Sequence, residues 1–222
     1  MNLPAFFDQV PRLRVQDPLA RILGCARDGI FEYGYGDAVR LAGHSCPTVA
    51  AAYWLTWLAL ERLYPDADTL PQRGAVRVDF RDDARSGSTG VVATVVQMLT
   101  GAGGGTGFKG IAGRFNRANL LRYAPQLLLS MRFTRLDTRD AVEVGADFTG
   151  LPSDPELEPL LARCLADAAG EEEQQRLARL WQERVRHLLL DLPRDPCVFL
   201  VRQAECRRWP STEPALALLD GG

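Results

Sequence analysis

The stretch CPTVAAAYWLTWLALERL, residues 46–63, decides the fold of this chain. A proline suits the first position of a helix, where no backbone N–H is needed, and Ser45 or Cys46 just before it can cap that helix. Apolar residues then lie on almost every side of the helix, which we expect to end near Tyr64. A helix without a polar face is buried, so this one is predicted at the centre of the molecule.

The segments on either side of this helix alternate between strand and helix patterns. A strand is predicted at 75–80, because Val76, Val78 and Phe80 share one face while charged residues take the other. We further expect a helix at 18–27, an extended segment at 30–42, a helix at 89–100, paired strands at 127–136 and 141–148, helices at 155–169 and 171–190, and a strand at 197–202. The predicted fold class is α+β, with a mixed or antiparallel sheet, a central buried helix and C-terminal helices.

The pattern changes after Pro152, where two long helical segments replace the strands. A boundary is therefore placed near residue 150. The predicted organisation is an α+β domain over 1–150 and a helical C-terminal extension over 151–222 that packs on it.

Composition narrows the class of protein. The 222 residues carry a net charge of −2 and no basic stripe with interleaved aromatic residues, which argues against nucleic acid as a partner. The central helix is too short and too interrupted by polar residues to cross a bilayer. The cysteines are odd in number and form no C-x-x-C motif, which favours a reducing compartment. They are Cys25, Cys46, Cys164, Cys197 and Cys206. With no secretory signal at the N-terminus, the chain is predicted to be cytoplasmic, with no membrane partner.

The pair His44-x-Cys46 at the start of the central helix is the sharpest chemical feature. Helix N-termini favour a thiolate, and a thiolate beside an imidazole is a ligand pair for zinc, copper or iron. The same pair also suits an activated nucleophile. A third interpretation is structural, with Cys46 a packing residue and His44 a turn residue. His187, the other histidine, lies on an amphipathic helix and is interpreted as a surface or core residue.

A glycine-rich loop at 101–113 holds seven glycines and Lys109, the only lysine of the chain. Flexible glycines let backbone N–H groups approach an anion, and a lysine adds a point charge. The loop is not a P-loop, because Gly110 follows the lysine where Ser or Thr would be required. The alternative is a solvated loop with an ordinary lysine.

Four short motifs occur in a fixed order along the chain. They are LAGHSCP at 41–47 before the apolar helix, DARSG at 83–87 after a strand, LTG at 99–101 ending a helix, and FKG at 108–110 in the glycine loop. In that order they resemble the E-type subunit family of formylmethanofuran dehydrogenase, which reads H-G-H-x-C-P-G, D-A-C-G, L-T-G and G-K-G. The resemblance covers roughly residues 30–148.

The resemblance implies a metal held by the histidine, the first cysteine and a downstream cysteine. Here Arg85 or Ser86 stands at the downstream cysteine, Ala42 replaces the family's first histidine, and Thr48 replaces the glycine after the Cys-Pro pair. The cysteine-rich zinc module of longer members is also missing. An oxygen donor from the segment 82–86 would then complete the metal site.

The predicted metal ligands are therefore His44, Cys46 and Asp83, with zinc the expected metal. Lys109 and Ser86 are predicted to bind a small anionic ligand.

Several functions fit these residues. The first is a metal-binding protein or metal-dependent accessory factor of the kind that this family implies, acting with a partner enzyme or a small anionic ligand. The second is a thiol enzyme with Cys46 as nucleophile, His44 as base and Lys109 in an anion site. The third is a non-catalytic assembly or chaperone module. Haem is a further cofactor alternative, because Cys46-Pro47 is the dipeptide of some haem-responsive proteins. Whether the chain is an enzyme stays open.

A homodimer is also predicted. The central helix, the strand at 75–80 and the helix at 89–100 are broadly apolar, and a second copy is the commonest way to cover more than one apolar face. A donor from that copy would also complete a two-ligand metal site. The competing explanation is that the C-terminal helices fold back and cover the same faces.

Overall fold

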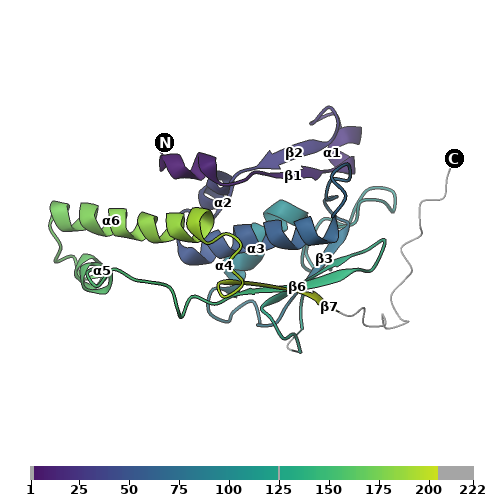
Figure 1. Cartoon of the computed structure of the whole chain (residues 1–222). Coiled ribbons are helices and arrows are strands. Elements are labelled where there is room, and N and C mark those ends of the chain that lie inside the picture. The colour runs from purple at the N-terminus through teal and green to yellow at the C-terminus, as the bar shows by residue number, and fades with distance from the viewer. Residues whose placement is uncertain (1–2, 125, 205–222) are drawn as a thin grey trace.

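A five-stranded sheet forms one layer of the computed structural model, which describes residues 3–124 and 126–204 (Figure 1). Its strands are β3 (Val76–Phe80), β4 (Leu121–Tyr123), β5 (Met131–Arg135), β6 (Ala141–Ala146) and β7 (Phe199–Ala204), in the order β4-β3-β5-β6-β7. Strands β3 and β4 are parallel and all other neighbours are antiparallel. With the helices described below, this confirms the predicted α+β class and its mixed sheet.

Side chains alternate in direction along the strands, and this gives the sheet one apolar face. Val76, Val78 and Phe80 of β3 are buried, as predicted, and Phe133 of β5 and Val142 of β6 are buried beside them in register. Side chains of successive strand residues point to opposite faces, so these residues line the same side. That side packs against helix α3.

Helix α3 (Pro47–Leu63) is the predicted central helix, and it is buried on nearly every side. Its cover comes from the sheet, from α4 (Thr89–Thr100), from α2 (Tyr35–Ala42), and from α6 (Glu171–Arg186) with the wider turn η2 (His187–Asp191) that follows it. Trp54 of α3 donates its indole N–H to the carbonyl of Pro193 and stacks on Trp57 at 4.8 Å. The C-terminal part of the chain therefore supplies the cover for which a second copy was invoked; the homodimer itself stays a prediction.

The N-terminal segment forms a separate two-stranded antiparallel sheet. It comprises η1 (Ala5–Gln9), β1 (Leu13–Gln16), α1 (Pro18–Ile22) and β2 (Ile30–Tyr33), with β1 paired to β2. The helix expected at 18–27 is shorter than predicted because the chain turns at Gly24, which has a φ of +72°. The prediction of an extended segment at 30–42 is wrong in its second half, which is helical. Gly34 donates its N–H to the Asp37 carboxylate at 2.8 Å, and this bond starts α2.

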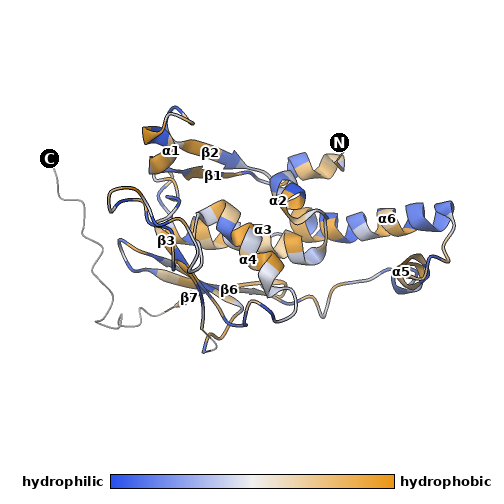
Figure 2. Ribbon diagram, turned by 180° about the vertical axis from the view of Figure 1, so that it is seen from behind, coloured by the Kyte–Doolittle hydropathy of each residue, from blue (hydrophilic) through white to orange (hydrophobic). Residues whose placement is uncertain are grey.

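Helices α5 (Leu157–Leu165) and α6 form a hairpin that projects to one side of the sheet, as Figure 1 shows. After η2 the chain returns to the sheet, where β7 pairs along all of β6. The residues after 150 therefore supply an edge strand as well as helices. In Figure 2, apolar residues gather where α3 and α4 face the sheet, while the outer part of α6 is mostly polar. Within the described residues no helix is long and apolar enough to cross a membrane.

Candidate functional site at the start of helix α3

A sharp turn carries the chain from α2 into α3. Helix α2 ends at Gly43, whose φ of +80° is left-handed and whose N–H bonds to the Val39 carbonyl at 2.8 Å. Glycine enters this conformation without steric cost, which is why it ends many helices. Only three residues, 44–46, separate this turn from α3, so they are held at the junction of the two helices.

His44 and Cys46 are in contact at this junction. The Nε2 atom of His44 lies 3.4 Å from the Sγ atom of Cys46, and Nδ1 lies 3.1 Å from the carbonyl of Ala42. Because a carbonyl only accepts, this hydrogen bond requires a proton on Nδ1. In the neutral ring, Nε2 then faces the sulfur with its lone pair. The same sulfur caps α3 by accepting the N–H of Val49 at 3.5 Å.

Ser45, between these two residues, holds the segment through hydrogen bonds to three side chains. Its carbonyl accepts the indole N–H of Trp181 at 2.8 Å and the amide of Gln182 at 3.5 Å, both from α6. Its hydroxyl lies 2.9 Å from the hydroxyl of Tyr35, a buried side chain whose pKa is raised by burial. With Ser45 held inward, His44 is exposed and Cys46 is half-buried, so both are reachable from solvent.

Asp83 and Ser86 lie in the exposed loop between β3 and α4. The Asp83 carboxylate accepts the N–H of Arg85 at 3.0 Å, and its carbonyl accepts the N–H of Ser86 at 2.9 Å. In the described residues, no group of three or more His, Cys, Asp or Glu side chains is placed to hold a metal ion. The structure thus brings His44 and Cys46 together and does not add Asp83 to them.

Lys109 is exposed on the glycine-rich loop. The loop is shaped by backbone bonds to the segment 114–119, such as the N–H of Gly103 to the carbonyl of Arg117 at 2.8 Å. A Cβ at Gly110 would lie 2.1 Å from the Arg114 carbonyl, so this glycine allows two backbones to touch. Gly103 and Gly107 likewise meet backbone atoms at 3.0 Å, so these three glycines have a packing role. The anion site proposed for Lys109 and Ser86 stays a prediction.

Sequence reasoning missed the residues that hold the site. They include Tyr35 and Trp181, because nothing in their local sequence indicates a bond to Ser45. His187, interpreted as structural, bonds the Asp191 carboxylate at 2.9 Å on the surface. Cys206 lies outside the described residues.

No protein-family model matches the chain, and no curated protein matches it either. The resemblance to the formylmethanofuran dehydrogenase family therefore rests on the four motifs alone.

Proposed function

We propose that this chain is a metal-binding protein in which His44 Nε2 and Cys46 Sγ bind one transition-metal ion, most simply Zn²⁺. In a tetrahedral zinc site, bonds of about 2.3 Å to sulfur and 2.1 Å to nitrogen place the two donors about 3.6 Å apart. The separation of 3.4 Å between Nε2 and Sγ is close to that value. This distance is the observation that carries the proposal.

The bond from His44 Nδ1 to the Ala42 carbonyl supports the same assignment. Histidines that bind metals usually donate their other ring N–H to a carbonyl or carboxylate, which fixes the tautomer and the ring orientation. Cys46 also stands at the N-terminus of α3, where the helix dipole favours a negatively charged group such as a metal-bound thiolate.

Two protein donors leave coordination positions for other groups. Zinc takes four ligands in most protein sites, and sites with open positions serve catalysis or ligand capture. The exposed side of His44 allows water, a small anionic ligand or a donor from a partner protein to complete the shell. An accessory role that hands a metal or a metal-bound ligand to a partner enzyme fits this open arrangement.

The test is metal binding by the purified chain with matched variants. Cobalt titration, read from the thiolate-to-metal absorption, and elemental analysis after zinc loading are expected to show one equivalent per chain. His44→Ala and Cys46→Ala should each weaken binding at least about tenfold, because each removes a ligand. His187→Ala and Cys197→Ala are the controls, since both residues lie elsewhere on the surface. Folded protein that binds no metal, or equal affinity in all four variants, would refute the proposal.

The contact between His44 and Cys46 also favours a second candidate, a thiol enzyme with Cys46 as nucleophile. An imidazole at 3.4 Å can take the thiol proton and leave a reactive thiolate. In chelated protein this candidate requires Cys46 to alkylate faster than the exposed Cys197, and His44→Ala to remove the difference. Equal alkylation rates at the two cysteines would exclude the thiol enzyme and leave the metal proposal standing.

A further inference from the structure

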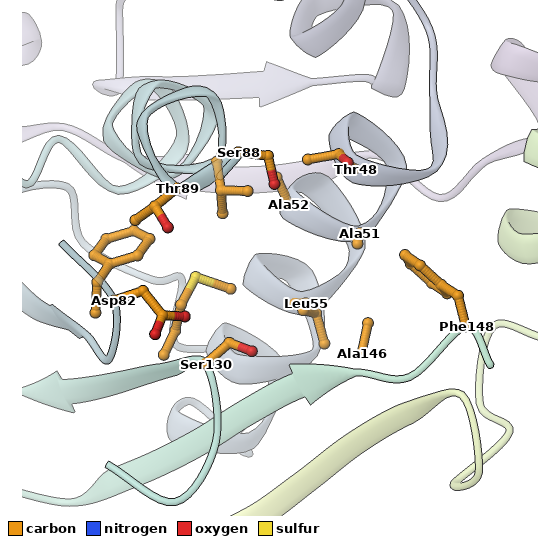
Figure 3. Close-up of a pocket in the computed structure, with 13 residues that line it drawn as sticks. Thr48, Ala51, Ala52, Leu55, Asp82, Ser88, Thr89, Ser130, Ala146 and Phe148 are labelled. Carbon is orange, nitrogen blue, oxygen red and sulfur yellow. The ribbon is translucent and has the colours of Figure 1, made fainter. Parts of the chain in front are cut away.

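A cavity of about 170 Å³ lies between the first turns of α3 and α4 and the adjoining end of the sheet (Figure 3). Its floor is apolar and includes Ala51, Leu55, Phe80, Met131 and Phe148. Its polar lining consists of Thr48, Asp82, Ser88, Thr89 and Ser130. Neither His44 nor Cys46 lines it, so the cavity is separate from the proposed metal site.

The hydroxyl groups of the lining are available to a ligand. Threonines in helix interiors bond the carbonyl four residues earlier, as Thr56 does to Ala52 at 2.7 Å and Thr94 to Gly90 at 2.9 Å. Thr48 and Thr89 stand in first turns, where no helical carbonyl precedes them. Within the described part of the chain their hydroxyls form no hydrogen bond, and the same holds for the other two, Ser88 and Ser130.

One side of the lining attracts positive charge. Asp82 supplies the only ionisable side chain among the lining residues. Arg81 approaches both of its oxygens, but only at 3.5 and 3.4 Å. Figure 3 shows Asp82 and Ser130 together on the sheet side of the cavity. A carboxylate beside a hydroxyl can accept two N–H bonds from an ammonium group.

The opposite side supplies donors. Figure 3 places Thr48, Ser88 and Thr89 across the cavity from Ser130, at the starts of the two helices. The hydroxyl of Ser88 does not cap α4. The N–H groups of Thr89 and Val92 are bonded to the carbonyls of Ser86 and Ser88, so the donors on this side are the three hydroxyls. Three hydroxyl groups on one side of a cavity can donate to a carboxylate.

We propose that this cavity binds a small α-amino acid with an apolar side chain. The ammonium group lies against Asp82 and Ser130, the carboxylate against the hydroxyls of the helix starts, and the side chain against the floor formed by Ala51 and Leu55. The size is suitable, because a cavity of about 150 Å³ holds a benzene molecule. This assignment does not depend on a metal at His44 and Cys46.

Calorimetric titration of the full chain with three probes tests the assignment. L-valine carries both charges, isobutylamine lacks the carboxylate, and 3-methylbutanoate lacks the ammonium. L-valine is expected to bind at least about tenfold more tightly than either, since each analogue lacks one charged contact. Asp82→Asn and Thr89→Val should each weaken L-valine binding, by about tenfold and a few-fold respectively. Asp68→Asn, on an exposed loop, and Thr94→Val, on the same helix as Thr89, should leave it unchanged.

Several outcomes would overturn the assignment. One is the absence of both heat and chemical-shift change with L-valine at about 10 mM. Another is equal binding of the amine or the acid alone. A third is an equal loss of L-valine binding in Asp82→Asn and Asp68→Asn. Methyl resonances of Ala51 and Ala52 give a second readout that needs no variant. Shifts induced by L-valine should concentrate at these methyls, and shifts confined to other regions would place the ligand elsewhere.

Discussion

Replacement of Asp17 by asparagine should destabilise the chain far more than its small chemical change suggests. The carboxylate is 3% exposed and accepts bonds from Arg73 at 2.8 Å and Arg117 at 2.6 Å. It also caps α1 by accepting the N–H groups of Leu19 and Ala20. This one side chain thus joins the N-terminal strands to the segments before β3 and β4.

The magnitude follows from what asparagine keeps and loses. Its amide oxygen can still cap α1, so the cap contributes little to the loss. The charge disappears, and the amide nitrogen turns a donor toward one of the two guanidinium groups. Breaking a buried ion pair typically costs about 3–5 kcal/mol. Since Arg73 and Arg117 are each 15% exposed and keep some contact with water, we expect about 3 kcal/mol.

Urea unfolding at pH 7 measures this loss, with Glu61→Gln as the matched control. Glu61 also binds an arginine through both oxygens, Arg194 at 2.9 and 2.6 Å, but the two side chains are 44% and 60% exposed. The control should therefore lose less than about 1 kcal/mol. Equal losses in the two variants would show that burial of Asp17 does not set the strength of its ion pairs.

The effect of Asp17 should also depend on pH in a defined direction. Burial alone would raise the pKa of Asp17, but the hydrogen bond and charge of Arg117, with Ala20 N–H and Arg73, lower it below 3.8. A lowered carboxyl pKa stabilises the fold above the unfolded value and loses this effect as the pH falls through the folded value. The difference between wild type and Asp17→Asn should therefore be constant from pH 7 to about 5 and shrink below 3.8.

Two further predictions concern other buried or strained positions. Glu143 is 1% exposed and binds Arg132 at 3.0 Å. Burial would raise the pKa of Glu143, but Arg132 lowers it below 4.5. In urea unfolding, Glu143→Gln should therefore cost about 3 kcal/mol of stability at pH 7 and less below pH 4.5. An unchanged cost at low pH would contradict the role of the charge. Gly29→Ala should lower the melting temperature much more than Gly43→Ala, because a Cβ at Gly29 would lie 2.5 Å from the Asp17 carbonyl while Gly43 faces open space. Both have positive φ, so Gly43→Ala should cost only the strain, about 1 kcal/mol, and equal losses would show that the contact is relieved.

Local signals in the sequence predicted the elements that carry their own start and stop residues. Helix α3 begins at Pro47 as predicted, and α4 ends at Thr100 because Gly101 adopts a left-handed φ of +73°. The strands β5 and β6 lie within their predicted ranges around the turn at 137–140. In each case the deciding residue lies next to the element that it starts or ends.

Predictions failed where the deciding contact is distant or competes with a misleading pattern. Aromatic alternation from residue 30 onward predicts β2 but continues past it, where the Asp37 carboxylate accepts the Gly34 N–H and starts α2. The bond from Trp181 to Ser45 joins residues 136 positions apart, so no local pattern contains it. The same holds for Asp17 and Arg117, which are 100 positions apart. The sequence therefore identified His44 and Cys46 as a pair but not the residues that orient them.

The C-terminal part of the chain connects the site to the core. Trp181 of α6 holds the Ser45 carbonyl, and the buried Leu188 and Leu189 of the following turn are part of the core that surrounds α3. Strand β7 then pairs with β6 over its whole length. Since this segment covers the apolar helix within one chain, the need to bury α3 does not require a second copy. If the proposed metal binds at His44 and Cys46, its further donors need not come from an obligate dimer, and a dissociable ligand or partner is the simpler source.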